Sequence, residues 1–200
     1  MKFWPLIVLA VACVMVPAAS ANSITWDFAT APNASLGSTT HTYTAGGISI
    51  FATGSTNLYY KVGGGDETGL GLACCDSDHE INPGQSITLN LGGLFSKKIT
   101  NLTLMLGSIQ NGESGSVCDA FAHCMTFNSS SDFKPVKIMS LYADMKAHHS
   151  GQLIVTAGSG DVLINQLQAT ASTVPEPSSL LLMGSGLLAM TGVVRRKLRL

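Results

Sequence analysis

The feature that most constrains this fold is the alternation of apolar and polar residues through the middle of the chain. In residues 86–91, for example, Ile87, Leu89 and Leu91 alternate with polar neighbours. Successive side chains of a β-strand point to opposite faces, so a period of two predicts half-buried strands rather than helices. The same pattern recurs in residues 24–28, 48–50, 58–62, 99–106, 136–143, 152–157 and 162–170.

Clusters of turn-forming Gly, Asn and Pro separate these runs, as at residues 63–65 and 82–84. Eight or nine short strands at this spacing predict an all-β fold, an antiparallel β-sandwich of jelly-roll type. Residues 112–132 are rich in Ser and have no clear period, which predicts a long loop. Residues 140–149 fit a strand followed by a loop as well as they fit a helix, so we predict no helix in this domain.

The N-terminal segment has the order of a secretory signal. Lys2 precedes an apolar stretch over residues 3–16, which is followed by a run of small residues that includes Ala19 and Ala21. This order predicts a signal peptide over residues 1–21, cleaved after Ala21 by signal peptidase. Cys13 raises lipidation as an alternative fate for this segment.

The C-terminal segment contains a second apolar run, residues 180–194, which carries no charge. As a helix this run is about 22 Å long, short of the roughly 30 Å hydrocarbon core of a bilayer. It therefore predicts a short transmembrane helix of marginal length. The basic residues that follow it are Arg195, Arg196, Lys197 and Arg199. Such residues stay on the cytoplasmic side, which places the preceding domain outside the cytoplasm.

Residues 22–173, between these two segments, are long enough for one domain with a core of its own. This stretch contains six Lys and no Arg against eleven Asp and Glu, a net charge of about −5. Binding to phosphate needs clustered cationic side chains, so nucleic acid is excluded as a partner.

Four cysteines remain in this domain, Cys74, Cys75, Cys118 and Cys124, and in an exported chain an even number predicts disulfides. Cys118 and Cys124 could close a short loop and leave Cys74 and Cys75 as a vicinal pair. Alternatively, each residue of the adjacent pair could reach across to one of the others. A vicinal bridge needs unusual backbone geometry, which favours the cross-links.

A group of acidic residues before the strand at residues 86–91 is a candidate calcium site. Its members are Asp66, Glu67, Asp76, Asp78 and Glu80. Calcium prefers many hard oxygen ligands and also accepts backbone carbonyls from Gly-rich turns. The alternative interpretation is a solvated acidic loop, because the spacing lacks the Gly and final Glu of an EF-hand loop.

Zinc is a further alternative, with ligands from residues Cys74, Cys75, His79, Cys118, His123 and Cys124. Neither cysteine pair has the spacing typical of structural zinc sites, however, and an oxidising compartment consumes thiols. Catalytic motifs such as G-x-S-x-G and H-E-x-x-H do not occur, so we predict a non-catalytic protein. His148 and His149 fall in a predicted exposed turn.

Two other functional classes stay open at this point. Tyr59 and Tyr60, with Tyr43, Tyr142 and Trp26, could form a carbohydrate-binding face, since flat aromatic side chains stack on sugars. A glycoside hydrolase could use two carboxylates of the acidic group, if they opposed each other across a cleft.

The C-terminal residues carry a resemblance to a known family. Val174, Pro175, Glu176 and Pro177, followed by the apolar run and the basic cluster, resemble the PEP-CTERM sorting signal of Gram-negative bacteria. The resemblance implies recognition of the Pro-Glu-Pro element by exosortase, a membrane-embedded cysteine protease, in species that make extracellular polysaccharide. The segment GLGL…DHEI…ITLNLG, within residues 69–92, is also similar to a stretch of exported PEP-CTERM proteins with a sandwich domain.

These observations together predict an exported, non-catalytic protein, sorted through residues 174–200, with calcium as a candidate stabilising ion. The resemblance implies a transient anchor in the inner membrane, with the domain facing the periplasm before processing, and then a place at the cell surface or in the extracellular matrix. The resemblance makes extracellular polysaccharide, and hence the biofilm matrix, the expected surroundings and a candidate partner.

Overall fold

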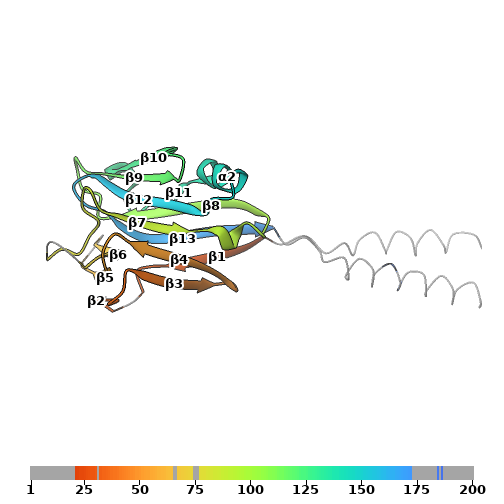
Figure 1. The fold of residues 1–200 in the computed structure, drawn as a ribbon, viewed down its shortest axis with the longest axis horizontal. Helices are drawn as coiled ribbons and strands as arrows, with labels where there is room; N and C mark the ends of the chain where they lie inside the picture. Colours follow the sequence, from red (N-terminus) through yellow and green to blue (C-terminus); the bar gives the residue numbers. More distant parts are fainter. Residues whose placement is uncertain are drawn as a thin grey trace, which may run out of the picture. The chain divides into compact units, whose positions relative to one another are not determined.

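The computed structural model describes residues 21–30, 32–64, 67–73, 77–172, 184 and 186. Asn22–Ala171 form one compact unit. Within it, two antiparallel sheets share a single hydrophobic core (Figure 1). The predicted all-β antiparallel architecture is confirmed, whereas the jelly-roll arrangement of the strands stays a prediction.

The first sheet contains seven of the described strands. In spatial order they are β11 (Val136–Lys137), β8 (Ile99–Gly107), β13 (Leu163–Ser172), β6 (Thr68–Leu72), β5 (Leu58–Val62) and β2 (Ala34–Ser35), and β1 (Ala21–Asp27) also pairs with β13. The long β8–β13 pair forms the centre of this sheet, with Leu104 opposite Leu167.

The second sheet contains six of the described strands. In spatial order they are β10 (Cys124–Asn128), β9 (Ser114–Asp119), β12 (Gln152–Ser159), β7 (Ser86–Asn90), β4 (Ile48–Gly54) and β3 (Thr40–Ala45). Two short 3-10 helices, η1 (Gly92–Leu94) and η2 (Ser129–Ser131), lie in the connections.

The core explains the alternation seen in the sequence. In β7, Ile87 and Leu89 are fully buried, while the polar residues that alternate with them face away from the core. Leu153 and Val155 of β12 repeat the pattern on the neighbouring strand, where they lie opposite Leu89 and Ile87. Burial of one face in every such strand is therefore what drives the two sheets together.

The predicted absence of a helix in this domain is wrong, because helix α2 spans Met139–Ala147 (Figure 1). Leu141, Tyr142 and Met145 lie on its buried face, at the spacing of adjacent helical turns. The Tyr142 hydroxyl donates a hydrogen bond to the Leu94 carbonyl at 3.0 Å, which fastens the helix to η1.

The prediction of a long loop over residues 112–132 is also wrong, because this segment forms the β9–β10 hairpin. The buried positions of β9 are Gly115, Val117 and Asp119. Only one of the three is a large apolar residue, so the period of two is hidden in the sequence.

Several sequence predictions fall outside the described residues. They concern most of the predicted signal peptide, including Ala19, the C-terminal sorting segment, and the residues Asp66, Cys74, Cys75 and Asp76. Ala21, the expected cleavage residue, is the first residue described and opens β1. Among the described helical residues there is no stretch long and apolar enough to cross a bilayer.

Candidate functional site

The first candidate site surrounds Lys61 on β5. Its side chain is buried, and its ammonium contacts three carboxylates. Glu67 Oε2 lies 3.1 Å from Lys61 Nζ, and Asp78 Oδ1 and Glu80 Oε1 accept hydrogen bonds from the same nitrogen. Three members of the predicted calcium set therefore converge on an ammonium group that the chain itself supplies.

Two glycines of the GLGL segment allow close backbone approaches, and the approach at Gly71 permits this convergence. A Cβ on Gly71 would lie 2.1 Å from the His79 carbonyl oxygen and 3.1 Å from Glu80 Cα. A Cβ on Gly69 would lie 2.6 Å from the Ile164 carbonyl oxygen of β13. Only glycine lets the backbone of residues 79–80 approach β6 this closely, and that approach places Glu80 inside the fold.

Glu80 is the most deeply buried member of the group, with no exposed surface. Its Oε1 accepts hydrogen bonds from Ser108 Oγ, at 2.9 Å, and from Lys61. In the part of the chain that the structure describes, no group donates a hydrogen bond to Glu80 Oε2.

The protonation of Glu80 follows from these surroundings. Burial raises the pKa of Glu80 to about 8, because it disfavours the charged form. Lys61 and Ser108 oppose this shift, whereas the negative charge of Asp161 and its hydrogen bond to protonated Glu80 support it. Two ionised carboxylates cannot hydrogen-bond to each other. Protonated Glu80 can donate a hydrogen bond to Asp161.

Lys61 stays charged in the same environment. Burial alone would lower the pKa of Lys61, but its contacts with Asp78, Glu80 and Glu67 outweigh burial and raise this pKa above its ordinary value. The charged ammonium of Lys61 thus lies among the three carboxylates and offsets part of their negative charge. Asp66 and Asp76, the other two predicted ligands, lie outside the described residues.

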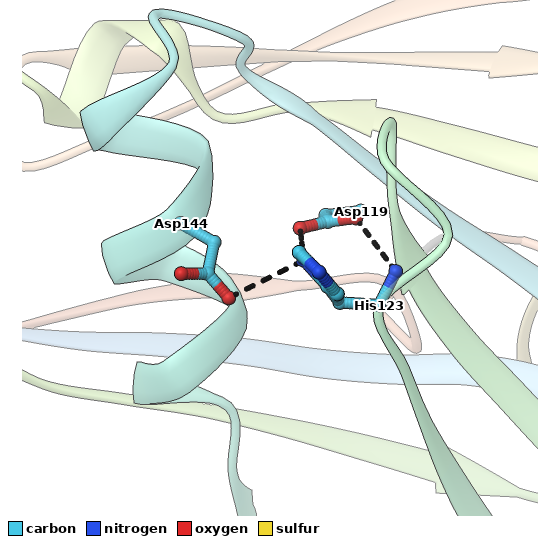
Figure 2. A group of neighbouring side chains, drawn as sticks. All are labelled: Asp119, His123 and Asp144. Atoms are coloured by element: carbon cyan, nitrogen blue, oxygen red, sulfur yellow. Dashed lines mark hydrogen bonds and ion pairs between the residues drawn. The ribbon is translucent and has the colours of Figure 1, made fainter.

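The second candidate site lies where the β9–β10 hairpin meets helix α2 (Figure 2). Asp119, the last residue of β9, is buried, and its Oδ1 accepts hydrogen bonds from the backbone N–H groups of Phe121, at 2.8 Å, and His123, at 3.0 Å. Its second oxygen, Oδ2, lies 3.0 Å from His123 Nδ1. The carboxylate therefore fixes both the hairpin loop and the orientation of the imidazole ring.

A disulfide between Cys118 and Cys124 closes this hairpin. The expected cross-links from Cys74 and Cys75 to these two residues are therefore wrong, as is the zinc set that needed Cys118 and Cys124 as thiolates. The physical reason is register, because Cys118 and Cys124 lie directly opposite each other on adjacent antiparallel strands.

Helix α2 contributes a second carboxylate to this site. Asp144 Oδ2 lies 3.5 Å from His123 Nδ1, on the side of the ring away from the hairpin (Figure 2). One turn further along the helix, the His148 ring packs against the Phe121 ring of the hairpin loop, with centroids 4.5 Å apart. His123 thus lies between a buried and a half-exposed carboxylate.

The pKa of Asp119 is set by competing effects. Burial raises it, but the backbone N–H groups of His123 and Phe121, together with the His123 side chain, more than compensate and lower it below the ordinary value. Asp119 therefore stays ionised near neutral pH.

The sequence did not predict the grouping of Asp119, His123 and Asp144, although one signal was present. The spacing Asp-x-x-x-His occurs twice, at residues 119–123 and 144–148. In the second copy Asp144 lies in helix α2, and His148 is the residue that caps its C-terminal end.

The aromatic residues divide between core and surface. Trp26 is buried and donates its indole N–H to the Ile48 carbonyl at 3.2 Å. Tyr43 is also buried, with its ring 4.7 Å from that of Phe28. Tyr59 and Tyr60 are half-buried, and the Tyr59 ring stacks on His79 with a centroid distance of 3.9 Å. Trp26 and Tyr43 are therefore core residues.

Comparison with known proteins identifies one segment. Residues 173–197 match the family model of the PEP-CTERM protein-sorting motif. No curated protein and no solved structure matches the chain.

The match defines a class of protein, one that is exported and processed at the membrane. More particularly, the chain carries the sorting motif of PEP-CTERM domain-containing proteins, the substrates of exosortase, as the resemblance in residues 174–200 predicted.

Proposed function

We propose that this chain delivers a non-catalytic β-sandwich to the cell surface or extracellular matrix after exosortase has processed its tail. The observation that carries the proposal is the sorting motif over residues 173–197. In this proposal Pro175, Glu176 and Pro177 form the element that exosortase recognises. The apolar run holds the chain in the inner membrane during processing, and the basic residues 195–199 retain the cytoplasmic end.

A structural role for the acidic group supports the non-catalytic part of the proposal. A glycosidase needs two carboxylates on either side of a sugar, about 5 Å or more apart. Glu67, Asp78 and Glu80 instead share one ammonium, which occupies the space between them. We therefore propose that Asp78 and Glu80 hold the segment that follows β6 against β5, while Glu67 holds the connection between β5 and β6.

Calcium stabilisation remains a prediction for the same group. Because Lys61 already contacts Glu67, Asp78 and Glu80, a calcium ion would have to displace its ammonium or bind beside it. Melting the full chain with increasing Ca²⁺ tests this point, since an ion that binds only the native state must raise the midpoint. An unchanged midpoint at millimolar Ca²⁺ would remove calcium from the proposal.

Carbohydrate binding is a second candidate function, favoured by the half-exposed Tyr59 and Tyr60 on β5. Pull-down of the chain by the polysaccharide matrix, compared between wild type and Tyr59→Ala, tests it. Retention that depends on Tyr59 supports a binding module, and equal retention leaves the sandwich as passive cargo.

The sorting proposal is tested by fractionating a host that has exosortase. We expect the full chain to reach the surface or the medium at a reduced mass, and a chain that lacks residues 174–200 to be mislocalised. Glu176→Ala should slow processing and leave the chain in the inner membrane. The matched control is Glu113→Ala in the sandwich, which should be sorted normally. Unchanged localisation of the truncated chain would overturn the proposal.

A further inference from the structure

The junction between the β9–β10 hairpin and helix α2 brings three metal-ligating side chains together. The ligand atoms of Asp119, His123 and Asp144 all lie within 4.8 Å of one another. Figure 2 shows the imidazole of His123 between the two carboxylates, one from the hairpin and one from the helix. Sorting of the chain through its tail makes no use of these residues.

The distances between these atoms fit a small tetrahedral metal site. His123 Nδ1 is 3.0 Å from Asp119 Oδ2 and 3.5 Å from Asp144 Oδ2. For metal–ligand bonds of about 2.0–2.1 Å, as for zinc with nitrogen and oxygen ligands, the edges of a tetrahedron measure about 3.3–3.4 Å. The two edges at His123 Nδ1 therefore lie within a few tenths of an ångström of tetrahedral values. The two carboxylate oxygens lie within 4.8 Å of each other, and a fourth position is left for water.

Hydrogen bonding alone does not account for the arrangement. An imidazole nitrogen carries at most one proton. His123 Nδ1 donates its proton in the hydrogen bond to Asp119. Asp144 faces the same nitrogen at 3.5 Å without a hydrogen bond of its own to it. A divalent cation in place of the proton would satisfy both carboxylates at once.

The three side chains also differ in exposure, since one ligand is buried and two can be reached from solvent. The side chain of Asp119 is completely buried, and the Cys118–Cys124 disulfide holds the hairpin that carries both Asp119 and His123. The side chains of His123 and Asp144 are 59% and 46% exposed, so an ion can enter from solution without unfolding. Asp119 and His123 come from the hairpin and Asp144 comes from helix α2, so two separate elements supply the ligands.

We infer that Asp119, His123 and Asp144 form a binding site for a divalent transition metal ion, with Zn²⁺ as the best match. Imidazole nitrogen favours zinc and its neighbours in the first transition row, whereas calcium prefers oxygen ligands alone. Oxidation of Cys118 and Cys124 excludes them as ligands, so this is a nitrogen and oxygen site. Binding replaces the proton on Nδ1, and the imidazole then carries its one proton on Nε2.

Calorimetry on the full chain tests this inference. The protein is purified in mild detergent without a polyhistidine tag, stripped of metal and titrated with Zn²⁺. We expect one Zn²⁺ per chain. His123→Gln and Asp144→Asn should each weaken binding at least 10- to 100-fold, because even second-shell changes cost about that much.

Two matched imidazole controls accompany these variants. His149→Asn removes a neighbouring exposed imidazole, and Asn tolerates the positive φ of 53° at that position. His148→Gln removes the imidazole that packs on Phe121. Both controls should bind Zn²⁺ as the wild type does. Loss of binding in His148→Gln as large as in His123→Gln would overturn the three-ligand site.

Substitution with Co²⁺ provides an independent readout. We expect visible absorption bands of tetrahedral intensity without a thiolate charge-transfer band. A thiolate band, or zinc affinity that both His123→Gln and Asp144→Asn leave unchanged, would overturn the inference. Circular dichroism of each variant confirms folding, and because Asp144 is half-exposed, Asp144→Asn decides the matter if His123→Gln does not fold.

Discussion

Lys61 and Glu80, nineteen positions apart in the sequence, meet in a buried hydrogen bond between β5 and the segment after β6. Glu67 and Asp78 complete the surroundings of the same ammonium. The stability of the sandwich should therefore depend on this single lysine more than on any exposed one.

Lys61→Met should lower the free energy of unfolding by roughly 3 kcal/mol, since removing one partner of a buried ionic group leaves the others uncompensated. Lys137→Met, on the exposed side of β11, is the matched control and should change stability by less than about 0.5 kcal/mol. Urea unfolding of both variants measures the difference. Equal stability of the two would show that the carboxylates do not need Lys61.

Glu80 should make stability depend on pH. Its pKa in the folded state is raised to about 8 from 4.5, so between these values the folded chain binds more protons than the unfolded chain. Stability from this group is then complete below about pH 4.5 and is lost as pH rises through 8. The loss is on the order of a few kcal/mol.

Glu80→Gln isolates this effect, because the amide keeps a donor toward Asp161 and an acceptor for Lys61 and Ser108 but does not ionise. Urea unfolding at pH 5 and pH 9 should show a marked loss of stability in the wild type and a much flatter response in Glu80→Gln. Parallel profiles of the two proteins would contradict the raised pKa.

Gly71→Ala should destabilise the fold by about 1–3 kcal/mol, the usual cost of overpacking. The new Cβ would meet the His79 carbonyl oxygen and Glu80 Cα, and both are backbone atoms that cannot rotate away. Gly64→Ala serves as the control, because a Cβ there meets nothing within 4 Å. Thermal melting compares the two, and similar midpoints would argue against the close approach of residues 79–80 to β6.

Removal of the disulfide by the double change Cys118→Ala and Cys124→Ala should lower the free energy of unfolding by about 2 kcal/mol, the chain-entropy value for so short a loop. Its pairing is checked independently by digestion without reductant. Cys118 and Cys124 lie on one tryptic peptide, residues 99–137, which should resist alkylation until it is reduced. A peptide linked to residues 62–97, which contain Cys74 and Cys75, would contradict this pairing.

The sequence predicted the structure best where the polarity of each side chain decides which face of a strand is buried. The alternation around Ile87 and Leu89 required a half-buried strand, and the structure has one. Helix α2 was missed because Leu141, Tyr142 and Met145 suit a helix face and a strand almost equally over so short a segment.

The candidate sites depended on contacts that no local pattern contains. Lys61 lies in a short strand, and nothing near it in sequence indicates that Glu80 will reach it past Gly71. The Cys118–Cys124 pairing followed from the register of a hairpin whose β-strand pattern was hidden by Gly115 and Asp119. The Lys61 site depends on a contact between residues nineteen positions apart, and the second site depends on the register of one hairpin and its packing against helix α2.

Strand β10 is an edge of its sheet, and the disulfide joins it covalently to β9. An exposed edge strand is the part of a sandwich most readily exchanged with a neighbouring molecule. Because Cys124, the first residue of β10, is bonded to Cys118, the disulfide hinders β10 from leaving its own sheet to complete that of another copy. The covalent link thereby opposes strand exchange between copies along this edge.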